Sequence, residues 1–200
     1  MRVPALLLVL FTAAFTGATA GGCAGPPAPL QEAHGPGERA TTPAAEVTLS
    51  GAGEFTSANT SSSTGAIAYN RKLVPKGAQA SLTAESSGDT TRTSLVVEGL
   101  LPNRRYGAHL HVKPCGRKPD DSGPHYQHHP GQVDPTSEVW LDVTTDGEGA
   151  GRSSARHDWA LDPAHLPGSL VLHSKATKTS GPQAGSAGDR IACLTLKKVQ

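Results

Sequence analysis

The fold class is decided by Ser94-Leu95-Val96-Val97-Glu98 and by Ile191-Ala192-Cys193-Leu194-Thr195-Leu196 near the end of the chain. Both stretches alternate apolar with polar residues, a pattern typical of strands that place one face against a core. From Glu46 onward helix signals are nearly absent, since Gly and Pro recur every few residues and Thr, Val and Ser dominate the runs between them. The sequence therefore predicts an all-β domain.

On both sides of these stretches the sequence predicts further short strands separated by turn residues. This pattern indicates an antiparallel β-sandwich or barrel with Greek-key connections. Two long loops, 113–137 and 176–188, interrupt the strands, and long loops on an all-β scaffold are where function is usually carried. The predicted strands are 47–50, 66–73, 79–86, 93–99, 107–112, 138–146, 152–161, 169–175 and 189–197.

The first 22 of the 200 residues are predicted to be a secretory signal peptide. Arg2 precedes an apolar run that ends at Phe15, and small residues follow. Two cleavage sites compete. Ala18-Thr19-Ala20 suits ordinary signal peptidase, and Ala20-Gly21-Gly22-Cys23 resembles a bacterial lipobox whose cysteine carries lipid. The Pro- and Gly-rich segment 23–45 is predicted to be a flexible spacer ahead of a domain over 46–200.

The cysteine count bears on this choice, because three cysteines in an exported protein leave one unpaired. Lipidation of Cys23 would leave Cys115 and Cys193 to pair, whereas the alternative is a free thiol. We expect an exported protein, either a cell-envelope lipoprotein anchored to the outer face of the membrane or a secreted one.

Charge excludes one class of partner. Without Arg2 the 18 basic residues become 17, which equals the 17 acidic ones, so the exported chain is neutral and is not a basic nucleic-acid binder. No later stretch approaches the ~18 consecutive apolar residues of a membrane span. Membrane contact is therefore expected only through a lipid anchor at Cys23.

Histidines gather in one region: five of the nine lie between His109 and His129. His109 and His111 are two residues apart in a predicted strand, so both side chains project from one face. His125 follows in a turn, and His173 ends another predicted strand. Four imidazoles without a thiolate favour copper or zinc, and a tetragonal site of four nitrogens suits Cu(II). The alternative is a strand that carries two solvent-facing histidines by chance.

These residues resemble the copper/zinc superoxide dismutases. Gly107-Ala108-His109-Leu110-His111 is similar to the Gly-Phe-His-Val-His strand of that family, and Gly123-Pro124-His125-Tyr126 to its Gly-Pro-His-Phe. Leu170-Val171-Leu172-His173 is similar to Leu-Val-Val-His, and residues 185–193 to Gly-Asn-Ala-Gly-Ser-Arg-Leu-Ala-Cys. Residues 142–146 add a weaker match to Asn-Val-Thr-Ala-Asp. The blocks occur in the family's order between Val47 and Leu196.

The resemblance implies an eight-stranded Greek-key β-barrel that dismutates superoxide. His109, His111 and His173 match the family's copper ligands, and His125 matches the imidazole that bridges copper and zinc. Arg190 matches the guanidinium that attracts and orients the anion, so Arg190 and His125 are the expected catalytic residues. The resemblance also implies a Cys115–Cys193 disulfide.

The resemblance fails at the zinc site. Thr136 and Val139 stand where the family has a zinc-binding His and Asp, and Thr177 stands near the position of the Asp that links the two metal sites. His128, His129, Asp134 and Glu138 lie close in sequence, but their spacing fits no family pattern; a solvated loop is the simpler interpretation. His157 and His165 belong to no motif and are expected on the surface.

The predicted function is copper-dependent disproportionation of superoxide to oxygen and hydrogen peroxide outside the cytoplasm. We expect about one copper and substoichiometric zinc per chain. The alternative is a non-catalytic copper-binding or copper-delivery protein of the cell envelope on the same fold.

Overall fold

The computed structural model describes residues 46–58 and 65–199, which are all-β apart from one short 3₁₀ helix. The predicted signal peptide, the spacer and the lipidation site Cys23 lie outside the described residues. The elements are β1 (Val47–Glu54), β2 (Thr56–Ser57), β3 (Ala66–Ala68), β4 (Gln79–Ser87), β5 (Thr90–Glu98), β6 (Arg105–Tyr106), β7 (Ala108–His111), η1 (Pro119–Ser122), β8 (Val143–Thr144), β9 (Gly151–His157), β10 (Ser169–His173), β11 (Arg190–Thr195) and β12 (Lys197–Lys198).

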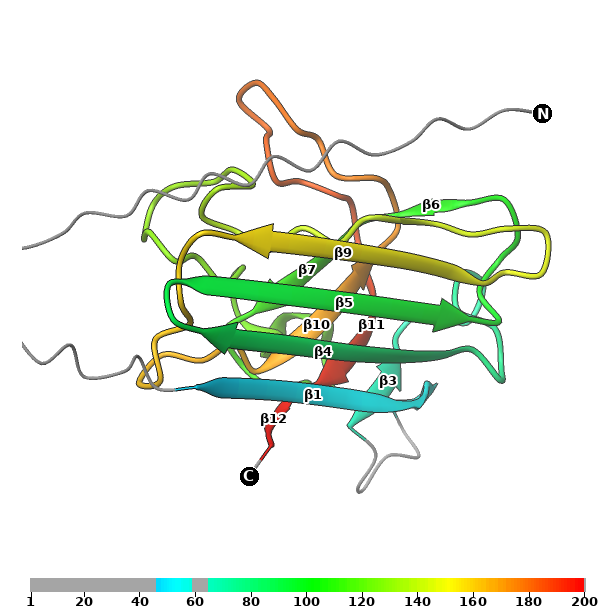
Figure 1. Cartoon of the computed structure of the whole chain (residues 1–200). Coiled ribbons are helices and arrows are strands. Elements are labelled where there is room, and N and C mark those ends of the chain that lie inside the picture. Colours follow the sequence, from blue (N-terminus) through cyan, green and yellow to red (C-terminus); the bar gives the residue numbers. More distant parts are fainter. Residues whose placement is uncertain (1–45, 59–64, 200) are drawn as a thin grey trace, which may run out of the picture. The chain divides into compact units, whose positions relative to one another are not determined.

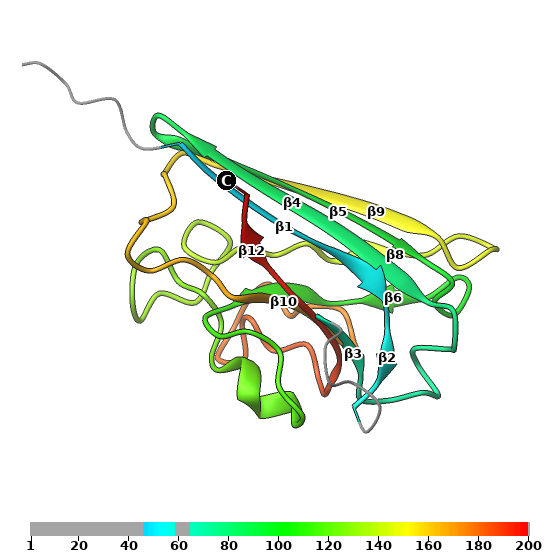
Figure 2. The same ribbon diagram turned by 90° about the horizontal axis from the view of Figure 1, so that it is seen from below.

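The strands form two five-stranded sheets and one two-stranded sheet. The first sheet has the order β12-β1-β4-β5-β9, the second has the order β2-β3-β11-β10-β7, and β6 pairs with β8 (Figure 1). All pairs are antiparallel except β2 with β3. Figure 2 shows the two large sheets as two layers, consistent with the predicted β-sandwich.

The first sheet follows the alternation of its sequence. In β4 the residues from Gln79 to Ser87 are exposed and buried in strict turn, and in β5 Leu95 and Val97 are buried while Ser94 and Glu98 are exposed. Because successive side chains of a strand point to opposite faces, one polar face meets solvent and one apolar face meets the second sheet.

A single apolar cluster fills the space between the sheets. Its largest fully buried members are Phe55 and Tyr106, accompanied by leucines from both sheets. The Tyr106 hydroxyl donates a hydrogen bond to the carbonyl of Leu73 at 3.0 Å, so burial of this polar atom is compensated. The cluster gives the strands that carry the histidines a rigid base.

The second sheet is buried on both faces, and the long loops explain why. All five residues of β10 and the central four of β11 are buried. Loop 113–137 packs against this sheet through η1 and through the predicted disulfide, Cys115–Cys193, which is confirmed. A hydrogen bond of 2.7 Å from the Ser169 hydroxyl to the carbonyl of Lys113 adds a further tie.

Some predicted boundaries are wrong. Within 138–146 only Val143–Thr144 is a strand, because Glu138 and Trp140 make isolated bridges to Gln127 and His109 instead of a continuous ladder. The segment 66–73 ends as a strand at Ala68, where a turn around Asn70 begins. The closed eight-stranded Greek-key barrel stays a prediction.

The structure also corrects the placement of one histidine. His157 is only 6 % exposed, and its Nε2–H is directed to the carbonyls of Pro135 and Glu138 at 3.2 and 3.1 Å, which compensates the burial of this atom. His165, in contrast, is on the surface as expected. In the described part of the chain, no helix is long and apolar enough to cross a membrane.

Candidate metal centre

The structure brings four histidines together as the sequence predicts: His109 and His111 from β7, His125 from the first long loop, and His173 from the end of β10. One ring nitrogen from each lies within 4.8 Å of the other three. His109, His111 and His173 are buried, whereas the His125 side chain is 19 % exposed. His125 therefore lies on the open side of the cluster.

Backbone carbonyls fix the proton positions of two rings. The Nδ1–H of His111 donates to the carbonyl of Gly123 at 2.9 Å, and that of His173 donates to the carbonyl of Gly188 at 3.2 Å. Both glycines have positive φ, 74° and 76°, a conformation that residues with a Cβ rarely adopt. The Nε2 atoms of both rings are buried without a hydrogen-bond partner. Each Nε2 therefore carries a free lone pair.

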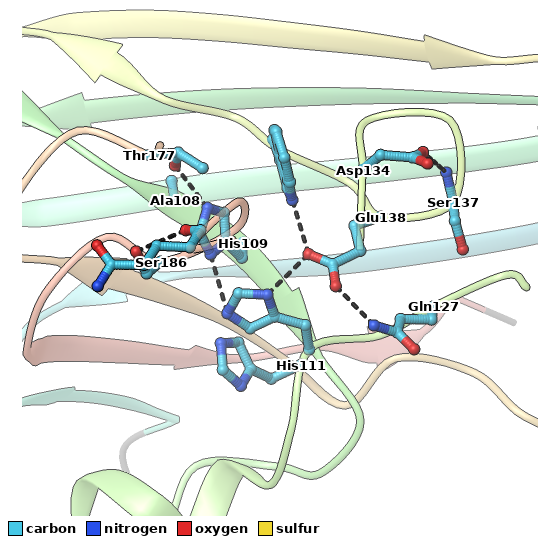
Figure 3. A network of polar contacts seen from close by, with 12 residues as sticks. Ala108, His109, His111, Gln127, Asp134, Ser137, Glu138, Thr177 and Ser186 are labelled. Atoms are coloured by element: carbon cyan, nitrogen blue, oxygen red, sulfur yellow. Dashed lines mark hydrogen bonds and ion pairs between the residues drawn. The ribbon is translucent and has the colours of Figure 1, made fainter. Parts of the chain in front are cut away.

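The other two rings are fixed by side chains. The Nε2 of His109 lies 2.7 Å from the Thr177 hydroxyl oxygen (Figure 3). The Nδ1–H of His125 donates to the Glu138 carboxylate at 2.7 Å. The remaining nitrogens, Nδ1 of His109 and Nε2 of His125, face each other at 3.1 Å. When the His109 proton is on Nε2, two lone pairs face each other and repel, and a cation bound by both nitrogens removes that repulsion.

A metal ion fits this set of atoms. Metal–imidazole bonds of about 2 Å place opposite ligand atoms about 4 Å apart, so four nitrogens within 4.8 Å need only a small contraction. Nδ1 of His109 and Nε2 of His111, His125 and His173 would hold the ion. Each opposite nitrogen already has an acceptor or hydroxyl partner, as metal-ligating histidines usually do.

Burial keeps three of the rings neutral. Loss of hydration, and then repulsion from the neighbouring histidines, lowers the pKa of His109 far below its usual value. Burial likewise lowers the pKa of His111 to about 3, against the opposing effect of the Gly123 carbonyl. It lowers the pKa of His173 to about 4, against the carbonyl of Gly188. Neutral imidazole is the form that binds metal, so the site is ready for a cation at neutral pH.

Arg190 lies at the opening of the cluster. It lines a cavity of about 520 Å³ together with His125, His173 and residues 184–188. Its Nη1 donates to the Ser122 hydroxyl at 3.0 Å and to the carbonyl of Pro119 at 3.2 Å, so η1 holds the guanidinium in place. With its side chain 22 % exposed, Arg190 still presents positive charge to the cavity.

Two lysines extend the positive charge beyond this cavity. Lys175 and Lys178 line an adjoining cavity of about 510 Å³, which shares residues 186–188 with the first. The Lys178 ammonium is hydrogen-bonded to the Gln183 side chain. These lysines lie beside the approach to the histidines rather than within the cluster.

Glu138 is a buried hydrogen-bond acceptor, whereas its sequence position suggested a solvated loop. Its side chain is 1 % exposed, and its Oε2 accepts from His125 and from the Trp140 indole, both at 2.7 Å. Its Oε1 accepts from the Gln127 amide at 2.8 Å. Burial by itself would raise the pKa of Glu138, but these hydrogen bonds outweigh burial and hold the pKa below its usual value. An ionised carboxylate therefore occupies the side of His125 where the resemblance places zinc.

The remaining zinc candidates point elsewhere. The His128 ring stacks on Trp159 at 4.5 Å, and the Asp134 carboxylate caps a turn by accepting the backbone N–H of Thr136 at 2.8 Å. His129 contacts the His128 ring and bonds through its backbone to Ser137. Val139 lies in the apolar core. Among the described residues, the only histidine, cysteine or carboxylate group suited to a metal ion is the four-histidine cluster.

Sequence reasoning missed the partners that orient the rings. The sequence marks Thr177 only as a replacement for an Asp, and it does not mark Asp142 as a partner of the site. In the structure Asp142 accepts hydrogen bonds from both the backbone and the hydroxyl of Thr177. Glu138 and Trp140 are two residues apart in extended chain, and that spacing was a signal that both could face His125. The glycine carbonyls carry no signal in the sequence.

The chain matches no protein-family model and no curated protein. Membership of the copper/zinc superoxide dismutase family is therefore a proposal, based on the sequence motifs and on the histidine cluster.

Proposed function

We propose that this protein is a copper-dependent superoxide dismutase that acts outside the cytoplasm, with the family's eight-stranded Greek-key barrel as its scaffold. The observation that carries the proposal is the cluster of four imidazoles beside a guanidinium, at the wall of an open cavity. Four nitrogen donors without thiolate or carboxylate suit copper. A storage site would have no use for Arg190, because that side chain offers an anion a charge and fixed donors without binding the metal.

The net reaction converts two superoxide anions and two protons to oxygen and hydrogen peroxide. Copper, when bound, would supply the one-electron chemistry that the side chains lack. Arg190 attracts the anion and orients it toward the histidines, and its bonds to Ser122 and Pro119 limit the reorganisation that this requires. The exported chain predicted from the sequence has no net charge, so local positive charge has to provide the attraction.

His125 is the proposed proton carrier. Because Glu138 accepts the proton of Nδ1, only Nε2 of His125 could take up a proton and pass it on. The same atom would hold copper, so it could carry a proton only while it is not bound to the metal. The carboxylate at 2.7 Å stabilises the positive charge that the ring gains when Nε2 is protonated. His125 is also the most exposed of the four rings, which suits exchange of protons with the cavity.

The proposal includes a centre with one copper and substoichiometric zinc. It is supported by the Glu138 carboxylate on Nδ1 of His125, and by Val139 in the core where a zinc-binding Asp would be needed. Metal analysis of protein purified from its native compartment tests this. We expect about one copper per chain; tight equimolar zinc would contradict it.

Superoxide removal by metal-free, zinc-loaded and copper-loaded protein tests the activity, with His109→Ala as the variant that loses a ligand. We expect activity only with copper and none in His109→Ala. A copper-loaded wild type that binds one copper tightly but removes no superoxide would favour the alternative of a copper-delivery protein. Export, and anchoring by lipid at Cys23, belong to the same proposal and are tested by labelling the protein with a fatty acid in its native host.

A further inference from the structure

His109 differs from the other three rings in the nitrogen that it turns to the cluster. It offers Nδ1, whereas His111, His125 and His173 offer Nε2. A neutral imidazole has one proton, so His109 can bind a metal through Nδ1 only when that proton is on Nε2. A carbonyl or carboxylate enforces the tautomer of each of the other rings. For His109 the partner of Nε2 is the Thr177 hydroxyl, which can either donate or accept, and Nδ1 lies 3.1 Å from Nε2 of His125, which could accept a proton from Nδ1.

Asp142 removes this ambiguity. Its Oδ2 accepts the backbone N–H of Thr177 at 2.7 Å, and its Oδ1 accepts the Thr177 hydroxyl. A carboxylate has no proton to offer, so the hydroxyl has to donate to Asp142 and is left to accept from Nε2–H of His109. A more distant donor, the Ala108 backbone N–H at 3.4 Å from Oδ1, agrees with this polarity.

We propose that Asp142, acting through the Thr177 hydroxyl, sets the tautomer of His109 and so decides that Nδ1 is free for the metal. The inference rests on the proposed function only in treating the cluster as a metal site. Asp142 and Thr177 are positioning residues, since neither side chain provides a ligand atom to the cluster. Figure 3 shows Thr177 beside His109, on the opposite side of the histidine group from Glu138.

The same contact ties the second long loop to β7. Thr177 belongs to the segment between β10 and β11, and that segment is also held by the Gly107 N–H, which donates to the Lys175 carbonyl at 2.7 Å. Gly188, whose carbonyl orients His173, lies in the same segment. Thr177 therefore helps to fix the loop that orients a second ring of the cluster.

Asp142→Asn is the sharpest test because the change is nearly isosteric. The backbone N–H of Thr177 can only donate, so the amide oxygen has to remain at the Oδ2 position and the NH₂ group faces the hydroxyl. The hydroxyl then accepts from the amide and donates to Nε2 of His109. The ring proton moves to Nδ1, which is the atom that the metal needs.

The ¹⁵N chemical shifts of the His109 ring in metal-free protein report the tautomer directly. We expect wild type to be protonated at Nε2 and Asp142→Asn at Nδ1. Asp158→Asn, at an exposed aspartate directly after β9, is the matched control and should keep the wild-type tautomer. An Nε2–H tautomer in Asp142→Asn, or an Nδ1–H tautomer in wild type, would overturn the inference.

Thr177 provides a second test that does not depend on how Asp142→Asn folds. Thr177→Val removes the hydroxyl without changing the shape, so Nε2–H of His109 loses its acceptor and the Nδ1–H tautomer, which can donate to Nε2 of His125, should gain population. Cu(II) affinity measured by chelator competition should fall about 10- to 100-fold. Thr177→Ser should restore both, and Thr83→Val, an exposed position on β4, should change neither. A Thr177→Val protein with a single Nε2–H tautomer and wild-type copper affinity would refute the role of the hydroxyl.

Failure of the two proposals can be distinguished because the tautomer is measured without metal and without substrate. A tautomer that follows the variants supports the inference even if the protein removes no superoxide, in which case only the proposed function fails. A copper-loaded enzyme that removes superoxide, with a tautomer that ignores both residues, refutes the inference alone.

Discussion

Replacement of Glu138 by Gln tests whether the negative charge of a buried carboxylate stabilises the protein and its hydrogen bond to Nδ1 of His125. The carboxylate accepts three hydrogen bonds, two at Oε2 and one at Oε1. In Glu138→Gln the amide oxygen keeps the two donors at the Oε2 position, so Nδ1 of His125 keeps its proton. The amide NH₂ then faces the Gln127 amide, whose own oxygen is engaged by the backbone N–H of Gly131 at 2.8 Å.

The magnitude follows from these contacts. A hydrogen bond to a charged group contributes about 1.5–3 kcal/mol, and a neutral one about 0.5–1.5 kcal/mol, so two bonds weakened by about 1 kcal/mol each give about 2 kcal/mol. The donor–donor contact with Gln127 adds to this. We therefore expect metal-free Glu138→Gln to lose about 2–4 kcal/mol of unfolding free energy, and its Cu(II) affinity to fall about 10- to 100-fold, because a neutral partner makes Nε2 of His125 less basic.

The lowered pKa of Glu138 determines the direction in which pH changes this difference in stability. The pKa of Glu138 is held below its usual value of 4.5, so its stabilising effect is present above that pH and is lost as the pH falls through the lower, folded-state pKa. The difference in unfolding free energy between wild type and Glu138→Gln should be largest near neutral pH and should shrink below about pH 4.5.

The assay is denaturant unfolding of metal-free protein between pH 3 and 7, with chelator competition for copper at pH 7. Glu85→Gln, an exposed position on β4, is the matched control and should show neither effect. If the variant has the unfolding free energy and copper affinity of wild type at neutral pH, Glu138 is not the charged partner that stabilises His125.

Three further predictions concern Arg190, acid and the disulfide. Arg190→Ala should slow superoxide removal about 100-fold, as loss of one preorganised donor can, and weaken inhibition by small anions without releasing copper; unchanged rates would refute the assignment. In metal-free protein His111 and His173, with pKa values of about 3 and 4, stay neutral while the unfolded chain takes up protons below pH 6.5. Unfolding free energy should therefore fall from pH 6.5 to 4, by up to about 1.4 kcal/mol per pH unit for each ring, and equal stability by urea denaturation at pH 7 and pH 5 would contradict this. Replacing Cys115 and Cys193 by Ser opens a loop of 78 residues and should cost up to about 4.5 kcal/mol, measured by guanidinium denaturation; an unchanged midpoint would show that loop closure contributes nothing.

The fold class could be predicted because strand periodicity is a local property. Leu95 and Val97 alternate with polar residues, and the same alternation determines which face of β5 is buried. The predicted strand at 138–146 failed for a reason that no local pattern reports. Its neighbour is the short β7, with which it makes an isolated bridge from Trp140 to His109 and two backbone hydrogen bonds, so no continuous ladder forms.

The histidine cluster was predictable in part because two of its members share one strand. The spacing of His109 and His111 fixes a common face, whereas no local spacing connects His125 and His173 to them; their residue type suggested the same site, and the family resemblance supported it. Partners of the rings were less accessible. Thr177 lies 68 residues from His109, and Glu138 lies 13 residues from His125 across a loop, so only the folded chain brings them into contact.

The central claim is catalysis by a copper centre, and the number of superoxide anions consumed per copper tests it most directly. Protein loaded with one copper per chain would be exposed to repeated superoxide pulses while decay is followed optically. We expect each copper to remove many anions without loss of rate, and metal-free protein to remove none. Consumption that stops at about one superoxide per copper would contradict it, because a bound copper that reacts once is cargo and not a catalyst.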